Sequence, residues 1–458
     1  MTDGGYDIVI LGGGSGGYAC ALRAAELGKR VALIEKDKLG GTCLHRGCIP
    51  TKALLHAAEI ADLATEGHVF GVRSSLDGID MAGVNSYKDK VVTRLWKGLT
   101  GLVASRKIDV IEGAGRLVSP TSVQVGDRVL AGEHVVLASG SESRSLPGLA
   151  VDGQRVIASE HALQLDRVPA SVVVLGGGVI GVEFASVWRS FGAEVTIVEM
   201  LPHLLPTEEE SSSKLLERAF RRRGIGFKVG TSFESVKDTG SGVTVALEGG
   251  ATIDAELMLV AVGRGPVSAG LGYDEIGVAM DRGFVLVDEY CRTNIPTISA
   301  VGDLRPGMQL AHVGFAEGIM VAERLAGLSV VPIDYDGVPR VTYSDPEVAS
   351  VGLTSVQAIE RGYEITELTY DLAANGKSQI LQTAGAAKVI AAAGGGPVLG
   401  IHLVGARVGE LIAEAQLIYN WEAVPADVAQ LIHPHPTQSE ALGEAHLALA
   451  GKPLHVHS

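Results

Sequence analysis

Two cysteines, at positions 43 and 48, are the residues best suited to chemistry in this chain of 458 residues. They lie on a glycine-flanked loop, and the stretch that follows, 53–63, has a helical pattern. A helix start lowers the pKa of a thiol by stabilising the thiolate, which is the form that attacks disulfides. A structural zinc site needs four ligands, and the sequence has no second cysteine pair to complete one. A reactive dithiol is therefore favoured over two inert buried cysteines.

The elements that must position such a dithiol include a unit that occurs twice. Each copy has a short apolar strand (8–11 and 172–175), a glycine-rich turn, a helical pattern (to 28 and to 192) and a second strand ending on a glutamate. Seven residues match at one constant offset of 164: Gly12, Gly14, Gly17, Ala21, Gly28, Val31 and Glu35 correspond to Gly176, Gly178, Gly181, Ala185, Gly192, Val195 and Glu199. We call residues 12–17 and 176–181 the first and second fingerprints.

Each fingerprint has a physical reason. The first glycine permits a tight turn, the second lets the backbone approach a pyrophosphate, and the third lets the helix pack closely on the strand. The helix N-terminus favours the phosphates, and the glutamate accepts hydrogen bonds from a ribose. Glycine-rich turns also serve plain packing, but both copies follow a strand and precede a helix. Two dinucleotide sites are what an enzyme needs when it passes electrons between two cofactors.

The glutamate that ends the second unit bears on the choice of nucleotide. A 2′-phosphate would be repelled by Glu199, and NADP sites usually place arginines there. The residues that follow, 200–203, contain no arginine. The sequence therefore predicts NAD rather than NADP.

Composition limits the partners and the location. Apolar residues make up 46% of the chain and the formal net charge is −15, as in a globular enzyme with an acidic surface. Such a surface argues against nucleic acid or an anionic membrane as the main partner; it suits a basic partner, or simply keeps the protein soluble. No apolar stretch reaches the length of a membrane span, and no signal peptide is recognisable. We expect a cytoplasmic protein.

On these residues the whole chain resembles the pyridine nucleotide–disulfide oxidoreductases, and among them the members that oxidise dihydrolipoyl groups. The stretch from Gly41 to Lys52 looks like the redox-active disulfide of that family, with His45-Arg46 where the family usually has Asn-Val. The resemblance implies that Cys48 faces the flavin and that Cys43 exchanges with substrate. Lys52 and Glu183 match an ion pair that lies beside the flavin, where hydride passes to nicotinamide.

Further short segments match the family in order and spacing. They are Glu112–Gly115, Leu137–Ser141, Ala261–Arg264, Thr293–Pro296, Ala300–Asp303 and Leu310–His312. The residues expected to bind FAD are Gly12, Gly14, Gly17, Glu35, Gly41, Thr42, Lys52, Gly115, Ser139, Gly140, Asp303, Leu310, Ala311 and His312. Those expected to bind NAD are Gly176, Gly178, Ile180, Gly181, Glu183, Glu199 and Gly263. No metal is expected.

Near the C-terminus, the run from His433 to Glu440 carries a histidine and a glutamate of interest. By themselves the residues have plain interpretations: Thr437-x-x-Glu440 is a capping box that opens the last helix, and His435 is an ordinary loop histidine. The run also matches the His-Pro-Thr-x-x-Glu motif of the family. The resemblance then implies that His435 takes a proton from the incoming dithiol and that Glu440 orients it, at the disulfide of the other subunit. A homodimer follows.

The predicted fold is α/β, with two Rossmann-like dinucleotide-binding domains and an α+β C-terminal dimerisation domain. We expect an FAD domain (1–148), an NAD domain (149–268), a return segment completing the FAD domain (269–338) and an interface domain (339–458). The resemblance implies oxidation of protein-bound dihydrolipoyl groups with NAD, with lipoyl domains of acyltransferases or glycine-cleavage carrier proteins as partners. An NAD(P)H-dependent reductase of another small disulfide is the main alternative; a non-catalytic flavoprotein scaffold is disfavoured because both cysteines, His435 and Glu440 are present.

Overall fold

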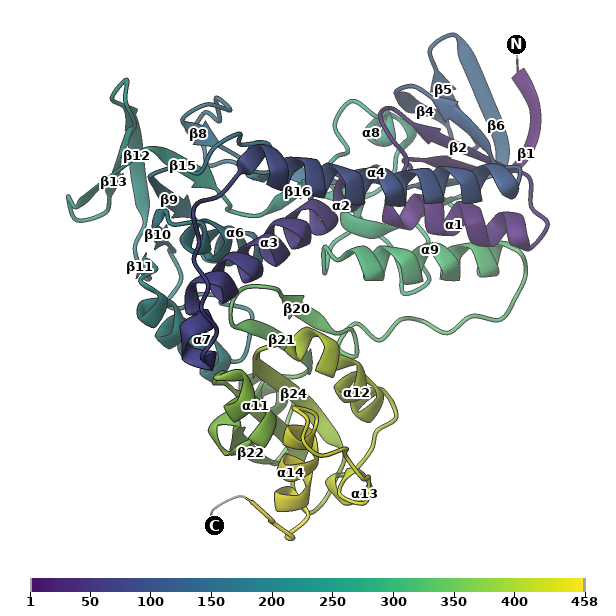
Figure 1. Cartoon of the computed structure of the whole chain (residues 1–458). Helices are drawn as coiled ribbons and strands as arrows, with labels where there is room; N and C mark the ends of the chain where they lie inside the picture. The colour runs from purple at the N-terminus through teal and green to yellow at the C-terminus, as the bar shows by residue number, and fades with distance from the viewer. Residues whose placement is uncertain (1, 456–458) are drawn as a thin grey trace.

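The first fingerprint lies at the centre of a mainly parallel sheet in the computed structural model, which describes residues 2–455 (Figure 1). Parallel strands run in the order β3-β2-β1-β6, β19 also pairs with β6, and β5 and β4 extend the sheet antiparallel. The bounds are β1 Thr2–Leu11, β2 Val31–Glu35, β3 Asp109–Glu112, β4 Gly115–Ser119, β5 Ser122–Val125, β6 Arg128–Leu137 and β19 Ile298–Ala300. Residues 8–11 are all buried, as expected of a central parallel strand. Helices α1 (Ser15–Glu26) and α9 (Ala311–Leu325) pack together below it.

The second fingerprint lies in a separate sheet of five parallel strands, ordered β11-β10-β9-β15-β8. Their bounds are β8 Val156–Ile157, β9 Ser171–Leu175, β10 Glu194–Val198, β11 Gly226–Lys228 and β15 Leu257–Val260. Helices α5 (Ser159–Ala162), α6 (Val179–Ser190) and α7 (Glu210–Arg223) accompany it. A small antiparallel sheet is formed by β12 (Phe233–Asp238), β13 (Val243–Leu247) and β14 (Thr252–Ala255).

Between these sheets run the helices that carry the cysteines. They are α2 (Gly41–Arg46) and α3 (Cys48–Glu66), which are followed by the 3₁₀ turn η1 (Gly67–Phe70) and by α4 (Met81–Ser105). The chain crosses between the two sheets at a short antiparallel ladder of β7 (Ser141–Ser143) and β16 (Arg264–Pro266). It returns to the first sheet through α8 (Tyr273–Ile276), β17 (Met280–Asp281), β18 (Phe284–Val285), β19 and the 3₁₀ turn η2 (Gly302–Leu304).

The C-terminal part is an antiparallel sheet ordered β20-β21-β24-β23-β22, with helices packed around it. Its strands are β20 Arg340–Thr342, β21 Glu347–Gly352, β22 Ile365–Asp371, β23 Ala386–Ala392 and β24 Val398–Gly405. Its helices are α10 Ser355–Glu360, η3 Leu372–Ala374, α11 Gly376–Leu381, α12 Val408–Asn420, α13 Pro425–Val428 and α14 Glu440–Leu449. In Figure 1 this part lies at the bottom of the view, at the opposite end of the molecule from β4, β5 and β6.

The predicted fold class is confirmed, but the predicted cap of the last helix is wrong. Thr437 does not cap the last helix: α14 begins at Glu440, directly after Ser439, and the Thr437 hydroxyl donates to the Pro434 carbonyl oxygen instead. Half of the predicted capping box remains, because the Thr437 N–H donates to the Glu440 side chain at 2.8 Å. Within residues 2–455 no helix is both long enough and apolar enough to cross a membrane.

Candidate active site

The first fingerprint is shaped by contacts that leave no room for two Cβ atoms. A Cβ on Gly12, whose φ is +114°, would lie 2.2 Å from the Ala138 carbonyl oxygen, and one on Gly17 would lie 1.8 Å from the Gly12 carbonyl oxygen. Gly14 differs, because the nearest heavy atom to its Cβ position is the Gly41 Cα at 3.9 Å. The first and third glycines thus allow turn and helix packing, whereas the second leaves the open space that a pyrophosphate needs.

The second fingerprint repeats this geometry. A Cβ on Gly176, with φ of +110°, would lie 2.3 Å from the Ala261 carbonyl oxygen, and one on Gly181 would lie 2.0 Å from the Gly176 carbonyl oxygen. No heavy atom lies within 4 Å of the Cβ position on Gly178. The N-terminus of α6 follows at once, so an anion placed over Gly178 would face free N–H groups.

The glutamates that end the two units make equivalent hydrogen bonds. Glu35 accepts from the N–H of Gly13 at 2.8 Å and from that of Asp37 at 2.9 Å. At the same offset of 164, Glu199 accepts from the N–H of Gly177 at 2.6 Å and from that of Leu201 at 2.8 Å. Each carboxylate therefore fixes its own glycine turn. A carboxylate has about four lone-pair sites, so each can still accept from a ribose hydroxyl.

One continuous cavity of about 1830 Å³ joins the two fingerprints and the cysteine pair. A single drug-sized ligand occupies a pocket of roughly 300–1,000 Å³, so this cavity has room for more than one such molecule. All of the residues predicted to bind FAD or NAD line it except Gly17 and Gly181, whose Cβ positions are filled by protein. The open positions at Gly14 and Gly178 and the size of the cavity fit two dinucleotides.

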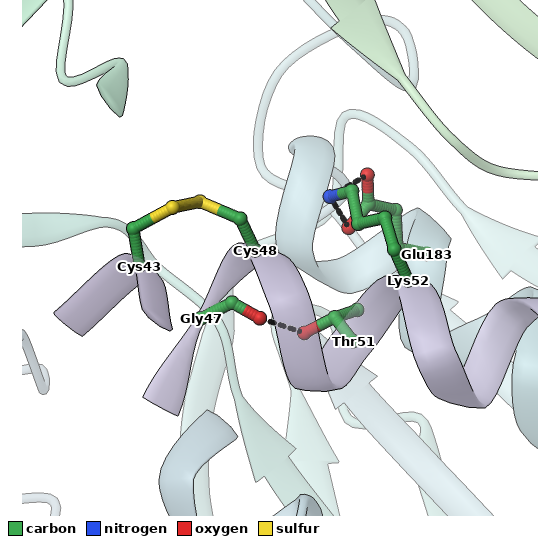
Figure 2. Close-up of a disulfide and its surroundings, with 6 residues drawn as sticks. All are labelled: Cys43, Gly47, Cys48, Thr51, Lys52 and Glu183. Carbon is green, nitrogen blue, oxygen red and sulfur yellow. Dashed lines mark hydrogen bonds and ion pairs between the residues drawn. A yellow bond between two sulfur atoms is a disulfide. The ribbon is translucent and has the colours of Figure 1, made fainter. Parts of the chain in front are cut away.

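Cys43 and Cys48 form a disulfide at the start of α3, as the sequence predicts (Figure 2). Cys43 lies in α2 and Cys48 is the first residue of α3, with their Cα atoms 4.7 Å apart. Both line the cavity. The turn before α3 is held by Thr51, whose hydroxyl donates to the Gly47 carbonyl oxygen at 2.7 Å. On reduction, the N-terminal end of α3 would stabilise a thiolate on Cys48.

The two remaining cysteines, Cys20 and Cys291, are buried and unbonded. Burial raises the pKa of both thiols to about 12, so neither is a thiolate near neutral pH. Residues 43 and 48 therefore carry the thiol chemistry of the described chain.

Lys52 and Glu183 come together one turn along α3 from Cys48. The Lys52 ammonium donates to both carboxylate oxygens of Glu183, each at 2.9 Å. Glu183 is 3% exposed, and the backbone N–H of Tyr343 donates to the same carboxylate at 2.9 Å. Figure 2 shows the pair beside the disulfide, on facing helices. Sequence reasoning found the pair but missed Tyr343, which belongs to no motif.

Asp303 lies where the two sheets meet. The Ser141 hydroxyl donates to the Asp303 carboxylate at 2.5 Å and accepts from Arg264 Nε at 2.8 Å. Burial lowers the pKa of Arg264, and the nearby Asp303 carboxylate opposes that shift. Asp303 lines the cavity, and its carboxylate accepts a hydrogen bond from Ser141 of β7, the strand that pairs with β16.

Two other predicted FAD contacts have side chains already engaged with protein. The Ser139 hydroxyl donates to the Val267 carbonyl oxygen at 2.6 Å and accepts from the Tyr273 hydroxyl at 3.1 Å. The His312 ring is bonded through Nε2 to the Pro339 carbonyl oxygen at 2.9 Å. Both residues line the cavity, so their contact with a cofactor stays a prediction.

His435 and Glu440 form a hydrogen-bonded pair outside this cavity. His435 Nδ1 lies 2.8 Å from Glu440 Oε1, and the histidine side chain is 78% exposed. Burial opposes ionisation of Glu440, but the Thr437 N–H and His435 outweigh it and hold its pKa below the usual range. Neither residue lines the cavity, and Figure 1 shows α14 well away from α2 and α3. One chain alone does not bring this base to its disulfide.

His433 and Glu414 form a second histidine–carboxylate pair, which sequence reasoning missed. His433 Nε2 lies 2.7 Å from Glu414 Oε1, and this hydrogen bond raises the pKa of His433. The sequence signal that could have pointed to His433 is the His-Pro-His-Pro alternation at residues 433–436. Within residues 2–455 no group of three or more His, Cys, Asp or Glu side chains could hold a metal ion.

The two residues that depart from the family pattern, at positions 45 and 46, make local contacts. His45 Nε2 bonds to the Leu39 carbonyl oxygen at 2.9 Å, which ties α2 to the loop before it. Arg46 forms an ion pair with Asp37, next to the carboxylate of Glu35. Both residues therefore brace the loop that precedes α2.

Comparisons with known proteins agree with this geometry. The family model for pyridine nucleotide-disulphide oxidoreductases matches residues 6–318, and the model for their dimerisation domain matches residues 338–446. The chain is 41% identical to dihydrolipoyl dehydrogenase of Bacillus subtilis (strain 168), over 98% of this chain and 99% of that one. It is 40% identical to the mitochondrial dihydrolipoyl dehydrogenase of Pisum sativum, over 98% and 92%. The crystal structure of LpdA from Mycobacterium tuberculosis matches with a TM-score of 0.90 at 27% identity, covering 96% of this chain and 99% of that one.

Proposed function

The chain belongs to the pyridine nucleotide-disulphide oxidoreductase family, and within it we propose that it is a dihydrolipoyl dehydrogenase acting in the cytoplasm. It is an oxidoreductase that uses FAD and NAD. The observation that carries the proposal is the disulfide at the start of α3, in one cavity with both fingerprints. Such a chain can accept two electrons from a dithiol and deliver them to NAD⁺.

The residues divide this reaction as follows. His435 of the partner subunit takes a proton from one dihydrolipoyl thiol, and Glu440 beside it stabilises the imidazolium that forms. The substrate thiolate attacks Cys43, which breaks the Cys43–Cys48 bond and leaves Cys48 as a thiolate at the helix start. The second substrate thiol then displaces Cys43 and its proton passes to the departing Cys43 sulfur, so that lipoyl is released and both protein sulfurs are reduced. FAD, when bound, supplies the two-electron step between this dithiol and NAD⁺.

Four regions of the chain share the work. Residues 1–148 and 269–338 form the FAD domain, residues 149–268 the NAD domain, and residues 339–458 the interface domain. Pairing of β19 with β6 supports the return of the chain to the first sheet, and the β7–β16 ladder supports one crossing point between the nucleotide domains. Lys52 of the first region meets Glu183 of the second beside the disulfide, at the junction that hydride must cross.

NAD is the nucleotide that the second fingerprint fits. Glu199 is 9% exposed and lines the cavity, where it would repel a 2′-phosphate. Its neighbours Met200 and Leu201 are exposed and apolar, so they offer no cation to such a phosphate. We expect at least a tenfold preference for NAD⁺ over NADP⁺, which corresponds to about 1.4 kcal/mol.

The enzyme is a homodimer, because its C-terminal region is the dimerisation domain of the family. Its further partners are lipoyl domains of acyltransferases or of glycine-cleavage carrier proteins. The net charge of −15 supports docking on basic subunit-binding modules, which salt should weaken. Binding that does not change between low and high salt would contradict this electrostatic account.

Anaerobic titration of the holoenzyme with dihydrolipoamide tests the dithiol reaction. We expect a two-electron reduced form with a long-wavelength thiolate-to-flavin absorption. Addition of dihydrolipoamide should not produce this form in the Cys43→Ser and Cys48→Ser variants, because each lacks the disulfide that accepts the electrons. Steady-state rates with dihydrolipoamide and NAD⁺ are then compared with rates for other small disulfides and NADPH. Faster NADPH-linked reduction of another disulfide would show that the chain is a reductase of a different substrate.

A further inference from the structure

The loop after β20 holds the Lys52–Glu183 pair from the side of the C-terminal sheet. The N–H of Tyr343 donates to Glu183 Oε1 at 2.9 Å, and the N–H of Asp345 donates to the Ser186 hydroxyl at 3.2 Å. Glu183 and Ser186 lie three residues apart on one face of α6. Backbone atoms therefore dock this loop on α6, and the docking does not depend on the side chain at position 343.

The same loop is anchored a second time by α7. Arg223 donates through Nη1 to the Asp345 carbonyl oxygen at 2.9 Å and lies 3.4 Å from the Asp345 carboxylate. Its Nη2 also donates to Asp62 of α3 at 3.1 Å. The loop is therefore bonded directly to α6 and α7, and Arg223 links it further to α3. These contacts hold the backbone that carries the ring of Tyr343.

That ring faces the Lys52 ammonium. Lys52 Nζ lies 4.6 Å from the centroid of the Tyr343 ring, within the range of a cation–π contact. An ammonium has three N–H donors, and two contacts go to the oxygens of Glu183. The Lys52 side chain is 33% exposed, so Glu183 does not enclose it on its own. Tyr343 itself lines the cavity beside the ion pair.

We propose that Tyr343 is a positioning residue of the reaction: its ring holds the Lys52 ammonium against Glu183 at the junction that hydride crosses. This inference rests on the proposed function only for the place of the ion pair. The ring acts through its π face, so the hydroxyl is not required. A phenylalanine at position 343 keeps the contact, and an aliphatic residue of similar reach loses it.

The experiment compares the Tyr343→Phe, Tyr343→Leu and Tyr343→Met holoenzymes with wild type. The first readout is the rate at which acetic anhydride labels the Lys52 amine at fixed pH, measured by peptide mass spectrometry. The ring contacts the Lys52 amine, so losing the ring frees the amine and should raise the labelling rate roughly 2- to 30-fold, the range that a cation–π contact spans in an equilibrium. Tyr343→Phe should stay within about twofold of wild type, since its ring retains the contact.

The second readout is the rate of flavin reduction by NADH in stopped flow, which needs no dithiol substrate. We expect Tyr343→Leu and Tyr343→Met to slow this step and Tyr343→Phe to leave it unchanged. The matched control is Tyr363→Leu, which removes a 44% exposed tyrosine outside the cavity and should change neither readout. Unchanged labelling in both aliphatic variants, or equal defects in Phe and Leu, would overturn the inference. Wild-type enzyme that fails to oxidise dihydrolipoamide, yet is reduced by NADH, would refute the proposed function alone.

Discussion

A methyl group added at Gly178 should affect the nucleotide, whereas the same methyl at Gly181 should affect the protein. No heavy atom lies within 4 Å of the Cβ position on Gly178, whose φ of −76° and ψ of −175° suit any L-residue. The Cβ position on Gly181 lies 2.0 Å from the Gly176 carbonyl oxygen. Within the same turn, the methyl at residue 178 therefore enters open space, whereas the methyl at residue 181 meets the backbone.

The expected magnitudes differ in kind. Gly181→Ala forces strand and helix apart, and overpacking of this sort costs about 1–3 kcal/mol of unfolding free energy. Gly178→Ala gains roughly 0.4–1 kcal/mol from the less flexible unfolded chain but loses a comparable amount because alanine is a poor N-cap. Its stability should stay within about 1 kcal/mol of wild type. A pyrophosphate that needs the open space meets the new methyl, at a cost of about 1–3 kcal/mol, or roughly 5- to 150-fold in affinity for NAD⁺.

Equilibrium dialysis of NAD⁺ against the FAD-loaded variants, with urea unfolding in parallel, separates these effects. Gly178→Ala should lose NAD⁺ affinity and keep its flavin content and stability. Gly181→Ala should lower the unfolding free energy of the protein. The reasoning fails if Gly178→Ala binds NAD⁺ as wild type does, because the open space would then not be where the dinucleotide lies.

Three further outcomes follow from the residues at the C-terminal end and the disulfide. Glu440→Gln removes the charge beside His435 and should lower the rate of dithiol oxidation by about 10²- to 10⁴-fold, with flavin reduction by NADH unchanged in stopped flow. Glu414 raises the pKa of His433, so the charged histidine contributes its full stabilisation below about pH 6.5 and loses it as the pH rises through the folded-state pKa. Urea midpoints measured from pH 6 to 8.5 should therefore fall with pH, and Glu414→Gln should make this fall smaller. Cys43→Ser should abolish dithiol turnover but keep NADH-dependent flavin reduction, and a variant that still oxidises dihydrolipoamide would exclude residue 43 as the exchanging cysteine.

The repeated unit shows how far a sequence can determine local geometry. The offset of 164, read from glycines and glutamates alone, also relates their hydrogen bonds: Gly13 to Glu35 and Gly177 to Glu199 are equivalent pairs. Such contacts are predictable because a tight turn between a strand and a helix admits few backbone conformations, and residue type reports which one is used. Element ends are less determined: the predicted start of α3 at residue 53 lies five residues after the observed start at Cys48.

Contacts between regions distant in sequence left no pattern to detect. Tyr343 reaches Glu183 across 160 residues, and Arg223 reaches Asp62 across 161. Neither Tyr343 nor Arg223 belongs to a motif, because the first contact forms only when α6 meets the loop after β20 and the second only when α7 meets α3. Family resemblance supplied Lys52 and Glu183 but said nothing about the ring beside them. Residues that position a known pair, such as Tyr343, can therefore be identified only from the three-dimensional structure.

The geometry of the exposed histidine at the C-terminal end bears on the two interpretations of its loop. His435 is 78% exposed, yet its ring is fixed by Glu440, whose second oxygen is held by the Thr437 N–H. Ordering an exposed side chain costs conformational entropy, and an exposed ion pair returns little. The proposed function gives this ordering a purpose. A base that must meet a disulfide on another subunit gains from it, because orientation set before the encounter removes that cost from the reaction itself.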